Sequence, residues 1–239
     1  MTLLLKKNLT ELSKKVIECN ADLGIAVDPD VDRLVFVCED GELFGEENTL
    51  VACADYVLSK TPGSTVSNLS SSRALNDITK KHNQVHYYSA VGEVNVVDKM
   101  KKCKAVIGGE GNGGVIYPKS HYGRDSIVGI GLFLSLYVER GLIASKLLET
   151  YPKYFMVKEK INLSPSLDVD NILGQIAEKY KNENIDLVDG VRIDFKDSWV
   201  QLRKSNTEPI IRIYSEAKSN DKASELIKEI EILIKNIIS

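Results

Sequence analysis

Short apolar segments alternate with amphipathic helical segments between residues 46 and 139, and this alternation constrains the fold more than any other feature of the chain. The helical patterns cover residues 46–59, 73–82, 91–102 and 125–139. The apolar runs that separate them cover residues 65–69, 85–89 and 105–108. Helices that alternate with short strands predict an α/β fold, in which an open sheet carries helices on its faces.

The pattern changes near Tyr151 and Pro152. Strand patterns are expected at residues 155–161, 187–195, 199–203 and 210–215, and helical patterns at residues 169–181 and in the last segment, where Leu226, Ile230, Leu233 and Ile237 form one stripe. Strands clustered between two helices favour an α+β domain. We therefore expect a boundary at about residue 152, with one domain over residues 42–152 and a second over residues 153–239.

The first 41 residues contain one helical pattern, at residues 8–20, and two apolar strands, at residues 23–27 and 34–38. One helix and two strands are too few to bury a core of their own. Residues 1–41 are therefore interpreted as the end of a domain whose beginning is absent.

Composition excludes several classes of protein. The formal net charge of −3 gives no basic excess for a nucleic-acid partner, and the apolar run from Leu3 to Leu5 is too short for a signal peptide or a membrane span. None of the four cysteines lies in a C-x-x-C pair, so free thiols in a reducing cytosol are expected. The sequence predicts a cytoplasmic protein without nucleic-acid or membrane partners.

The segment from Asp28 to Arg33, DPDVDR, is called the aspartate loop here. Asp28, Asp30 and Asp32 recur at every second residue, and carboxylates held so close repel one another unless a cation lies among them. Oxygen ligands alone suit a hard ion such as Mg²⁺. A calcium-binding EF-hand is excluded because Arg33 stands where that loop requires glycine and because strands flank the segment. The alternative is a solvated turn with unrelated aspartates.

A second candidate is the glycine-rich segment from Gly108 to Gly114, called the sugar loop below, which holds five glycines in seven residues. Glycines let a backbone approach a ligand closely, and Glu110 and Asn112 are candidates to hydrogen-bond sugar hydroxyls. The spacing fits neither a dinucleotide fingerprint nor a P-loop. His121 and Arg124 follow soon after and are expected to border the site. A flexible turn is the alternative interpretation.

The third candidate, called the phosphate loop, runs from Arg203 to Pro209, with Arg212 beyond it. It offers guanidinium, ammonium, hydroxyl and backbone N–H donors in one turn, which is the donor set that a phosphate dianion requires. An ordinary β-turn would also contain Ser, Asn, Thr and Pro. Ser70 to Ser72 are interpreted as a strand exit and a helix cap rather than as a nucleophile.

The three loops, taken in order, resemble those of the α-D-phosphohexomutase superfamily, which includes phosphoglucomutase, phosphomannomutase and phosphoglucosamine mutase. The aspartate loop is similar to the family's magnesium loop, D-G-D-G-D-R or D-P-D-x-D-R. Residues 109–114 are similar to its sugar-recognition loop, commonly G-E-x-S-G-H, and residues 203–209 to its phosphate loop, R-x-S-N-T-E-P. The resemblance covers almost the whole chain.

The resemblance implies a fold of four domains around a deep cleft. Residues 1–41 would be the end of the second domain with the metal loop, residues 42–152 the third domain with the sugar-recognition loop, and residues 153–239 the fourth domain with the phosphate loop. The first domain would be missing, and with it the catalytic phosphoserine, since no T-x-S-H-N-P-like motif is found in the sequence. The missing N-terminal domains would belong to the full-length protein.

The family mechanism moves a phosphoryl group between the 1- and 6-positions of a hexose phosphate through a phosphoserine. It implies Mg²⁺ on Asp28, Asp30 and Asp32, with Arg33 in a supporting role. It also implies the following residues as contacts of the hexose phosphate substrate: Glu110, Asn112, Arg124, Arg203, Ser205, Asn206, Thr207 and Arg212. No catalytic residue is assigned within the chain itself.

Two positions depart from the family pattern, since Asn112 stands where serine is usual and Gly114 where histidine is usual. The hexose, whether glucose, mannose or glucosamine phosphate, therefore stays open. Three interpretations follow: a C-terminal portion of a mutase that is inactive alone, a non-catalytic phosphosugar-binding module, or an α/β scaffold whose motifs are coincidental.

Overall fold

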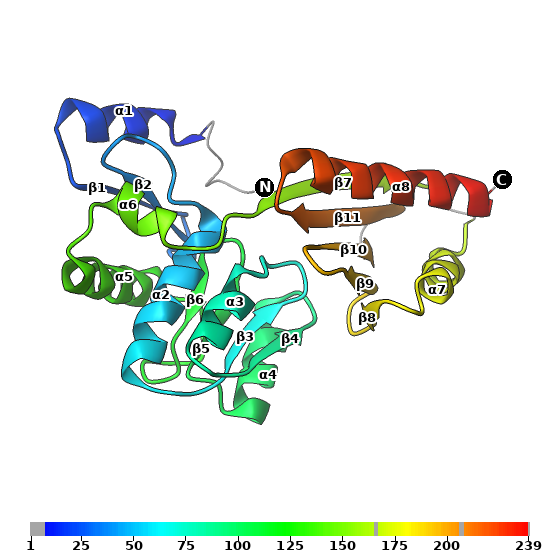
Figure 1. Ribbon diagram of the computed structural model, residues 1–239, viewed down its shortest axis with the longest axis horizontal. Helices are drawn as coiled ribbons and strands as arrows, with labels where there is room; N and C mark the ends of the chain where they lie inside the picture. Colours follow the sequence, from blue (N-terminus) through cyan, green and yellow to red (C-terminus); the bar gives the residue numbers. More distant parts are fainter. Residues whose placement is uncertain (1–7, 165–166, 206–207, 239) are drawn as a thin grey trace. The chain divides into compact units, whose positions relative to one another are not determined.

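The computed structural model of the chain describes residues 8–164, 167–205 and 208–238. It divides into two compact units, Met1–Pro152 and Lys153–Ser239. Figure 1 labels the helices and strands of both units.

The first unit begins with helix α1 (Thr10–Glu18) and a hairpin of strands β1 (Leu23–Val27) and β2 (Leu34–Cys38). The strands are antiparallel, and Leu23 pairs with Cys38 while Val27 pairs with Leu34. Every residue of β2 is buried, whereas β1 has a half-exposed pattern. Because Val27 and Leu34 close the hairpin, the aspartate loop is its connecting turn.

A four-stranded sheet follows, with the order β4-β3-β5-β6. Strands β3 (Thr65–Asn68), β4 (His86–Ser89) and β5 (Ile107–Glu110) are parallel, and β6 (Gly114–Ile116) runs antiparallel to β5. The helices of this unit are α2 (Glu46–Lys60), α3 (Ala74–Lys81), α4 (Glu93–Cys103), α5 (Ser126–Arg140) and the short α6 (Ala144–Glu149). The predicted α/β fold with an open sheet is confirmed.

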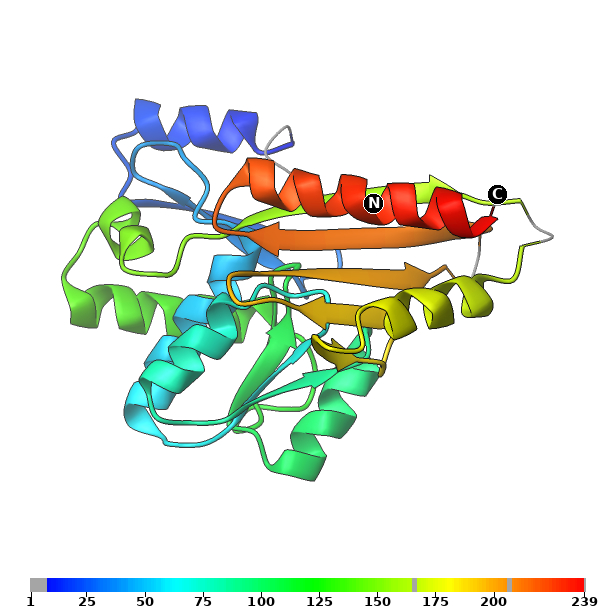
Figure 2. The ribbon, with the colours of Figure 1, turned by 45° about the vertical axis from the view of Figure 1, so that its right-hand side comes forward.

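The order of the strands explains why the helices cover both faces of this sheet. The step from β3 to β4 and the step from β4 to β5 run in opposite directions across the sheet, and right-handed crossovers then require α3 and α4 on opposite faces. Helices α2 and α3 contact each other, while α4 packs against β3, β4 and β5. Figure 2 shows the sheet lying between α4 and the pair of α2 and α3.

Parallel strands bring their carboxyl ends to one edge of the sheet, where ligands of such folds usually bind. At that edge, β3 ends at Asn68 and is followed by the serines at positions 70–72. Strand β5 ends at Glu110 in the sugar loop, and β4 leads to Gly92 before α4. Topology therefore gathers these polar segments at one place.

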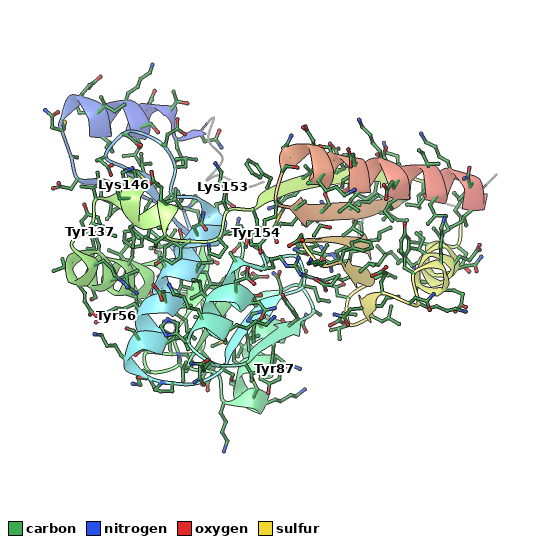
Figure 3. The ribbon with its side chains drawn as sticks, in the orientation of Figure 1. Tyr56, Tyr87, Tyr137, Lys146, Lys153 and Tyr154 are labelled. Atoms are coloured by element: carbon green, nitrogen blue, oxygen red, sulfur yellow. The ribbon has the colours of Figure 1, made fainter. Side chains whose placement is uncertain are left out.

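An aromatic cluster fixes the hairpin to the rest of the first unit. Phe36 of β2 stacks on Phe133 of α5 with ring centroids 3.7 Å apart, and Phe44 packs edge-on against Phe133 at 5.0 Å. Tyr137, labelled on α5 in Figure 3, stacks on the same Phe133 at 6.3 Å. Buried aromatic rings contribute large apolar areas to a core. They hold β2, and with it the aspartate loop, against α5.

The second unit is a five-stranded antiparallel sheet with the order β7-β11-β10-β9-β8. Its elements are β7 (Phe155–Asn162), α7 (Val169–Lys179), β8 (Asn184–Asp186), β9 (Val191–Asp194), β10 (Ser198–Lys204), β11 (Ile210–Ala217) and α8 (Asn220–Ile238). Helices α7 and α8 contact each other and the strands, and a cluster that includes Ile176, Val200, Ile213 and Ile230 is buried among them. The predicted α+β arrangement is present in this unit.

The expected strand over residues 187–195 is wrong in its first half. The observed strand is β9, and Leu187 and Val188 lie outside it with 64% and 61% of their surface exposed. Gly190 has φ +75°, and a Cβ there would lie 2.0 Å from the carbonyl oxygen of Leu202. The chain therefore turns at Gly190, and the apolar run preceding it does not enter the sheet.

Candidate functional site

The aspartate loop is a tight turn held together by the side chain of its first residue. Asp28 Oδ1 accepts hydrogen bonds from the backbone N–H groups of Asp32 and Arg33, at 3.2 and 3.1 Å. Val31, in the middle of the turn, has φ +56°, an uncommon conformation for a β-branched residue. The Asp28 side chain thus fixes a strained loop in one shape.

Arginine side chains lie against the carboxylates of this loop. Arg33 Nε is 3.3 Å from Asp28 Oδ2 and 3.7 Å from Asp32 Oδ1. Asp28 is buried, Asp32 is partly buried and Asp30 is exposed. The structure therefore brings Asp28, Asp32 and Arg33 together and leaves Asp30 at the surface.

The two inner carboxyl groups are close enough to influence each other's pKa. Burial raises the pKa of Asp32, and the charge of Asp28 adds to the rise against the lowering effect of Arg124. Burial also acts to raise the pKa of Asp28, but the hydrogen bonds from the Arg33 and Asp32 backbones outweigh it, so that this pKa lies below its usual value. Opposite shifts are what two acids sharing one site produce.

The aspartate loop offers part of the oxygen ligand set that a magnesium ion requires. Asp32 Oδ1 is buried and accepts no hydrogen bond from the described residues, so one hard oxygen is available to a cation. Within the described ranges, no three carboxylate, imidazole or thiol side chains gather into a complete metal-binding group. Mg²⁺ is usually held by only one or two carboxylates together with water and substrate phosphate, so a partial ligand set fits this ion.

Glu110 is the most enclosed acid of the sugar loop, with 5% of its surface exposed. Its Oε1 accepts hydrogen bonds from Asn68 Nδ2 at 2.7 Å and from the Gly92 N–H at 3.1 Å. Its Oε2 accepts one from Arg124 Nη1 at 2.9 Å. Asn112 Oδ1 accepts from the Gly114 N–H at 3.2 Å. Both residues that were predicted to contact a sugar are thus engaged within the protein.

The sugar loop and the aspartate loop are connected through backbone hydrogen bonds of the residues that flank them. Leu34, the first residue of β2, donates its N–H to the Gly113 carbonyl at 3.1 Å. The N–H and hydroxyl of Ser126, at the start of α5, donate to the Val31 carbonyl at 3.3 and 2.7 Å. The two loops therefore belong to one hydrogen-bonded assembly within the first unit.

Arg124 occupies the centre of this assembly. Its guanidinium faces three carboxylates from three segments, Asp32, Glu93 and Glu110. Arg124 was predicted as a substrate contact, together with a bordering His121. His121 Nε2 pairs with Asp125 Oδ2 at 2.8 Å instead of entering the group around Arg124.

The phosphate loop connects β10 and β11 in the second unit. Arg203 and Arg212 are directly paired in register, so their side chains project from the same face of the sheet. Each forms an ion pair with one acid, since Arg203 Nη1 is 3.4 Å from Asp189 Oδ2 and Arg212 Nη2 is 3.7 Å from Glu208 Oε2. Two adjacent, partly exposed guanidinium groups suit an anion.

The rest of the phosphate loop is defined in part. The Ser205 N–H donates to the Ile210 carbonyl at 3.0 Å, which closes the loop, and Lys204 Nζ pairs with Asp170 Oδ2 at 2.8 Å. Lys204 follows Arg203 in a strand, so it projects from the opposite face of the sheet. Asn206 and Thr207, which were also predicted as phosphate contacts, lie outside the described residues.

The sequence did not predict the residues that are distant from the sugar loop in the chain but hydrogen-bond to it in the fold. Asn68 holds Glu110, and Ser71 Oγ accepts the Gly111 N–H at 2.9 Å. Glu93 Oε1 accepts a hydrogen bond from the Arg124 backbone N–H at 3.0 Å, and Glu93 Oε2 lies 3.2 Å from Arg124 Nε. Their positions in the sequence could have indicated them, because Asn68 is the last residue of β3 and Glu93 the first of α4, and both lie at the carboxyl edge of the sheet.

Comparison with known families agrees with this geometry. Residues 46–154 match the family description "Phosphoglucomutase/phosphomannomutase, alpha/beta/alpha domain III", and residues 159–233 match "Phosphoglucomutase/phosphomannomutase, C-terminal domain". The chain belongs to the phosphoglucomutase/phosphomannomutase family. The family resemblance that the three loops indicated is therefore confirmed.

Two relatives show how the chain compares with curated members of the family. It is 36% identical over 226 residues to a phosphoglucomutase/phosphomannomutase of Thermococcus kodakarensis, covering 93% of this chain and 49% of the relative. It is 33% identical over 232 residues to a phosphoglucosamine/phosphogalactosamine mutase of Sulfurisphaera tokodaii, covering 95% of this chain and 51% of the relative. The chain thus spans about half the length of the curated relatives it matches.

A solved structure shares the fold. A phosphoglucomutase/phosphomannomutase family protein of Burkholderia thailandensis superposes with a TM-score of 0.84 at 24% identity, covering 98% of this chain and 51% of that one. Among the helices that the structure describes, none combines the length and apolar character needed to cross a membrane.

Proposed function

We propose that this chain forms the metal-, sugar- and phosphate-binding part of a phosphohexose mutase, which moves a phosphoryl group between the 1- and 6-positions of glucose, mannose or glucosamine phosphate. The observation that carries the proposal is the hydrogen-bonded assembly of the aspartate and sugar loops, in a chain that matches the third and C-terminal domains of this family. Residues 1–41 are assigned to the end of the preceding family domain, and the protein to the cytoplasm.

Each loop is assigned one chemical role in this proposal. Glu110 and Asn112 are assigned to the sugar hydroxyls, with Arg124 beside them. Arg203 and Arg212, together with Ser205, Asn206 and Thr207, hold the phosphate that is not being transferred. Paired guanidinium groups on one sheet face support this role because arginine binds phosphate bidentately. These residues bind and orient, and positioning supplies much of the rate of phosphoryl transfer.

Asp28, Asp30 and Asp32 would hold Mg²⁺, and Arg33 would support the transferring phosphate. A bound Mg²⁺ supplies positive charge that neutralises the phosphoryl oxygens. The buried Asp32 Oδ1 supports this assignment, because a desolvated carboxylate oxygen without a hydrogen-bond donor is stabilised by a cation. Asp28 would be a weaker ligand of the ion through Oδ1, since this oxygen already accepts hydrogen bonds from two backbone N–H groups.

The chain by itself is proposed to bind without turnover, because its sequence contains no T-x-S-H-N-P-like motif to supply a phosphoserine. A coupled assay that follows the conversion of glucose 1-phosphate into glucose 6-phosphate is expected to give no rate above background with the chain alone. Measurable conversion by these 239 residues would refute this part of the proposal.

The binding proposal is tested by calorimetry with glucose 1,6-bisphosphate in the presence of MgCl2. Arg203→Ala and Arg212→Ala are each expected to weaken binding by about 10-fold or more, because each removes a charge-assisted hydrogen bond. Lys204→Ala is the matched control, since Lys204 lies between these positions in the loop region but projects from the other sheet face. The proposal fails if the bisphosphate does not bind at millimolar concentration, or if the control weakens binding as much as the arginine variants do.

A further inference from the structure

The environment of Arg124 suggests a role that differs from direct contact with a substrate. We propose that Arg124 is a positioning residue that couples the sugar loop to the aspartate loop. The absence of a side chain at Gly114 leaves the room that the Arg124 side chain needs to reach both loops. The inference rests on the proposed function for the identity of the ligands. The contacts from which it is argued all lie within the first unit.

Each nitrogen of the guanidinium faces a different carboxylate. Nη2 lies 2.5 Å from Asp32 Oδ2, Nη1 lies 2.9 Å from Glu110 Oε2, and Nε lies 3.2 Å from Glu93 Oε2. The Arg124 side chain is only 15% exposed. The Nε contact is an ion pair without a hydrogen bond, so the two Nη groups make the fixing contacts. A planar, rigid fork that holds Asp32 and Glu110 fixes their positions relative to each other, which the single ammonium of a lysine cannot do.

Arg124 acts on one side through Asp32. It holds Asp32 Oδ2, while the other oxygen, Oδ1, is buried and accepts no hydrogen bond from the described residues. A partner that holds one oxygen of a carboxylate orients the second oxygen toward a metal, as the outer partners of metal ligands commonly do. Arg124 therefore determines where Asp32 presents its available oxygen.

Arg124 acts on the other side through Glu110. Asn68 and the Gly92 N–H hold Glu110 Oε1, and Arg124 holds Oε2. Any movement of Asp32 toward a cation pulls on the same guanidinium that holds Glu110. The sugar loop is therefore expected to respond when the aspartate loop is occupied.

Gly114 explains how the arginine reaches this position. A Cβ on Gly114 would lie 2.4 Å from Arg124 Cδ and 3.1 Å from Arg124 Cγ. Gly114 does not have a positive φ, so its backbone conformation does not require glycine. Glycine at 114 is needed because the Arg124 side chain passes over it. The histidine expected at this position from the family pattern would occupy the same volume.

The steric part is tested by a double-mutant cycle on thermal unfolding. Gly114→Ala is expected to lower the Tm of the otherwise unchanged protein by about 4 °C or more. In the Arg124→Ala background, where Cγ and Cδ are gone, the same change is expected to lower the Tm by less than half as much. Equal losses in the two backgrounds would overturn the pairing of Gly114 with Arg124.

The coupling part is tested by nuclear magnetic resonance of backbone amides as MgCl2 is added. In the unchanged chain, signals of Asp32 and Arg33 and those of Gly111 and Gly114 are all expected to move. In Arg124→Gln, the aspartate-loop signals should still move, while the sugar-loop shifts fall to less than half. Glu93→Gln is the matched control, because it weakens the third contact of Arg124 but leaves both loops attached, and it should keep both sets of shifts.

The outcomes separate this inference from the function on which it rests. If both loops still respond in Arg124→Gln, the coupling role is wrong and the metal-binding proposal survives. If no signal moves in the unchanged chain, the proposed metal site and the coupling through it are both wrong, and the thermal cycle alone decides the pairing of Gly114 with Arg124.

Discussion

At Gly113, glycine is required by both conformation and space. Its φ is +88°, and a Cβ would lie 2.2 Å from the backbone oxygen of Leu34. Gly113→Ala is expected to reduce the free energy of unfolding by about 2–4 kcal/mol, because backbone atoms cannot move aside as a flexible side chain can. The loss is measured by urea unfolding of the purified chain.

Gly131 provides the control for this substitution. It lies in α5, and a Cβ there meets nothing within 4 Å. Gly131→Ala is expected to stabilise the protein by about 0.4–1 kcal/mol through the lower entropy of the unfolded chain. If the two alanine variants unfold at the same urea concentration, the close approach between the sugar loop and Leu34 is not present.

The phenol of Tyr151, which lies beside the buried carboxylate of Asp55, makes the stability of the protein depend on pH. Asp55, which is 3% exposed, accepts hydrogen bonds from Arg140 Nη2 at 2.9 Å and from the Tyr151 hydroxyl at 3.3 Å, and it lies 2.7 Å from His82 Nε2. Burial raises the pKa of the Tyr151 phenol, and the charge of Asp55 raises it further. The fold therefore favours the protonated phenol.

The raised pKa of Tyr151 determines how the free energy of unfolding changes with pH. The folded-state pKa of Tyr151 lies above its unfolded value of about 10, so the contribution is complete below pH 10 and is lost as pH rises above it. The slope is about 1.4 kcal/mol per pH unit for one such group. Urea unfolding between pH 8 and 11 should show the difference between the unchanged protein and Tyr151→Phe shrinking above pH 10. A constant difference would contradict the assignment.

Among the elements, helix α5 connects the two loops because it begins beside both. Asp125 is its N-cap and accepts a hydrogen bond from the Val128 N–H at 3.0 Å. Asp125→Ala is expected to cost about 1 kcal/mol, whereas Asp125→Asn should cost only a few tenths because asparagine caps equally well. Comparison of urea midpoints tests this, and equal losses for the two variants would show that the charge rather than the cap matters.

Strands formed by continuous apolar runs could be predicted from sequence, whereas the shortest elements could not. The strands at residues 23–27 and 34–38 have the predicted bounds, because continuous apolar runs end there at polar residues. Strand β6, with three residues, and helix α6, with six, are too short to show a period. Strand β8 was missed for the same reason.

The residues of the candidate site also differ in how far the sequence alone could predict them. Asp28, Glu110 and Arg203 are candidates that the sequence alone offers, because their motifs are local. Glu93 and Asn68 could not, because they meet Arg124 and Glu110 only after the parallel strands bring their ends together. A single sequence also contains no signal that Arg124 passes over Gly114, since that contact depends on the path of the loop between β6 and α5.

In the whole molecule, each of the two compact units has its own apolar core. The core of the second unit includes Ile213, which is fully buried. Ile213→Ala is expected to cost about 2–5 kcal/mol through lost burial and the cavity left behind. Hydrogen exchange should show the loss of protection concentrated in Lys153–Ser239.

Ile232 supplies the matched control for that substitution. It lies on α8 in the same unit, with 59% of its surface exposed. Ile232→Ala should change the free energy of unfolding by less than about 0.5 kcal/mol. Equal effects of the two variants, or a loss of protection spread evenly over residues 8–152, would contradict separate cores.

The contact between Gly114 and Arg124 also restricts the order in which these positions can change during evolution. The Arg124 side chain could take its place beside residue 114 only in an ancestor that already had glycine there. Even the methyl group of an alanine at 114 would lie 2.4 Å from Arg124 Cδ. Once Asp32 and Glu110 had come to depend on that arginine, a larger residue could not return to 114 without first displacing it. The two positions are thus expected to vary together among descendants, with the change at 114 as the earlier step.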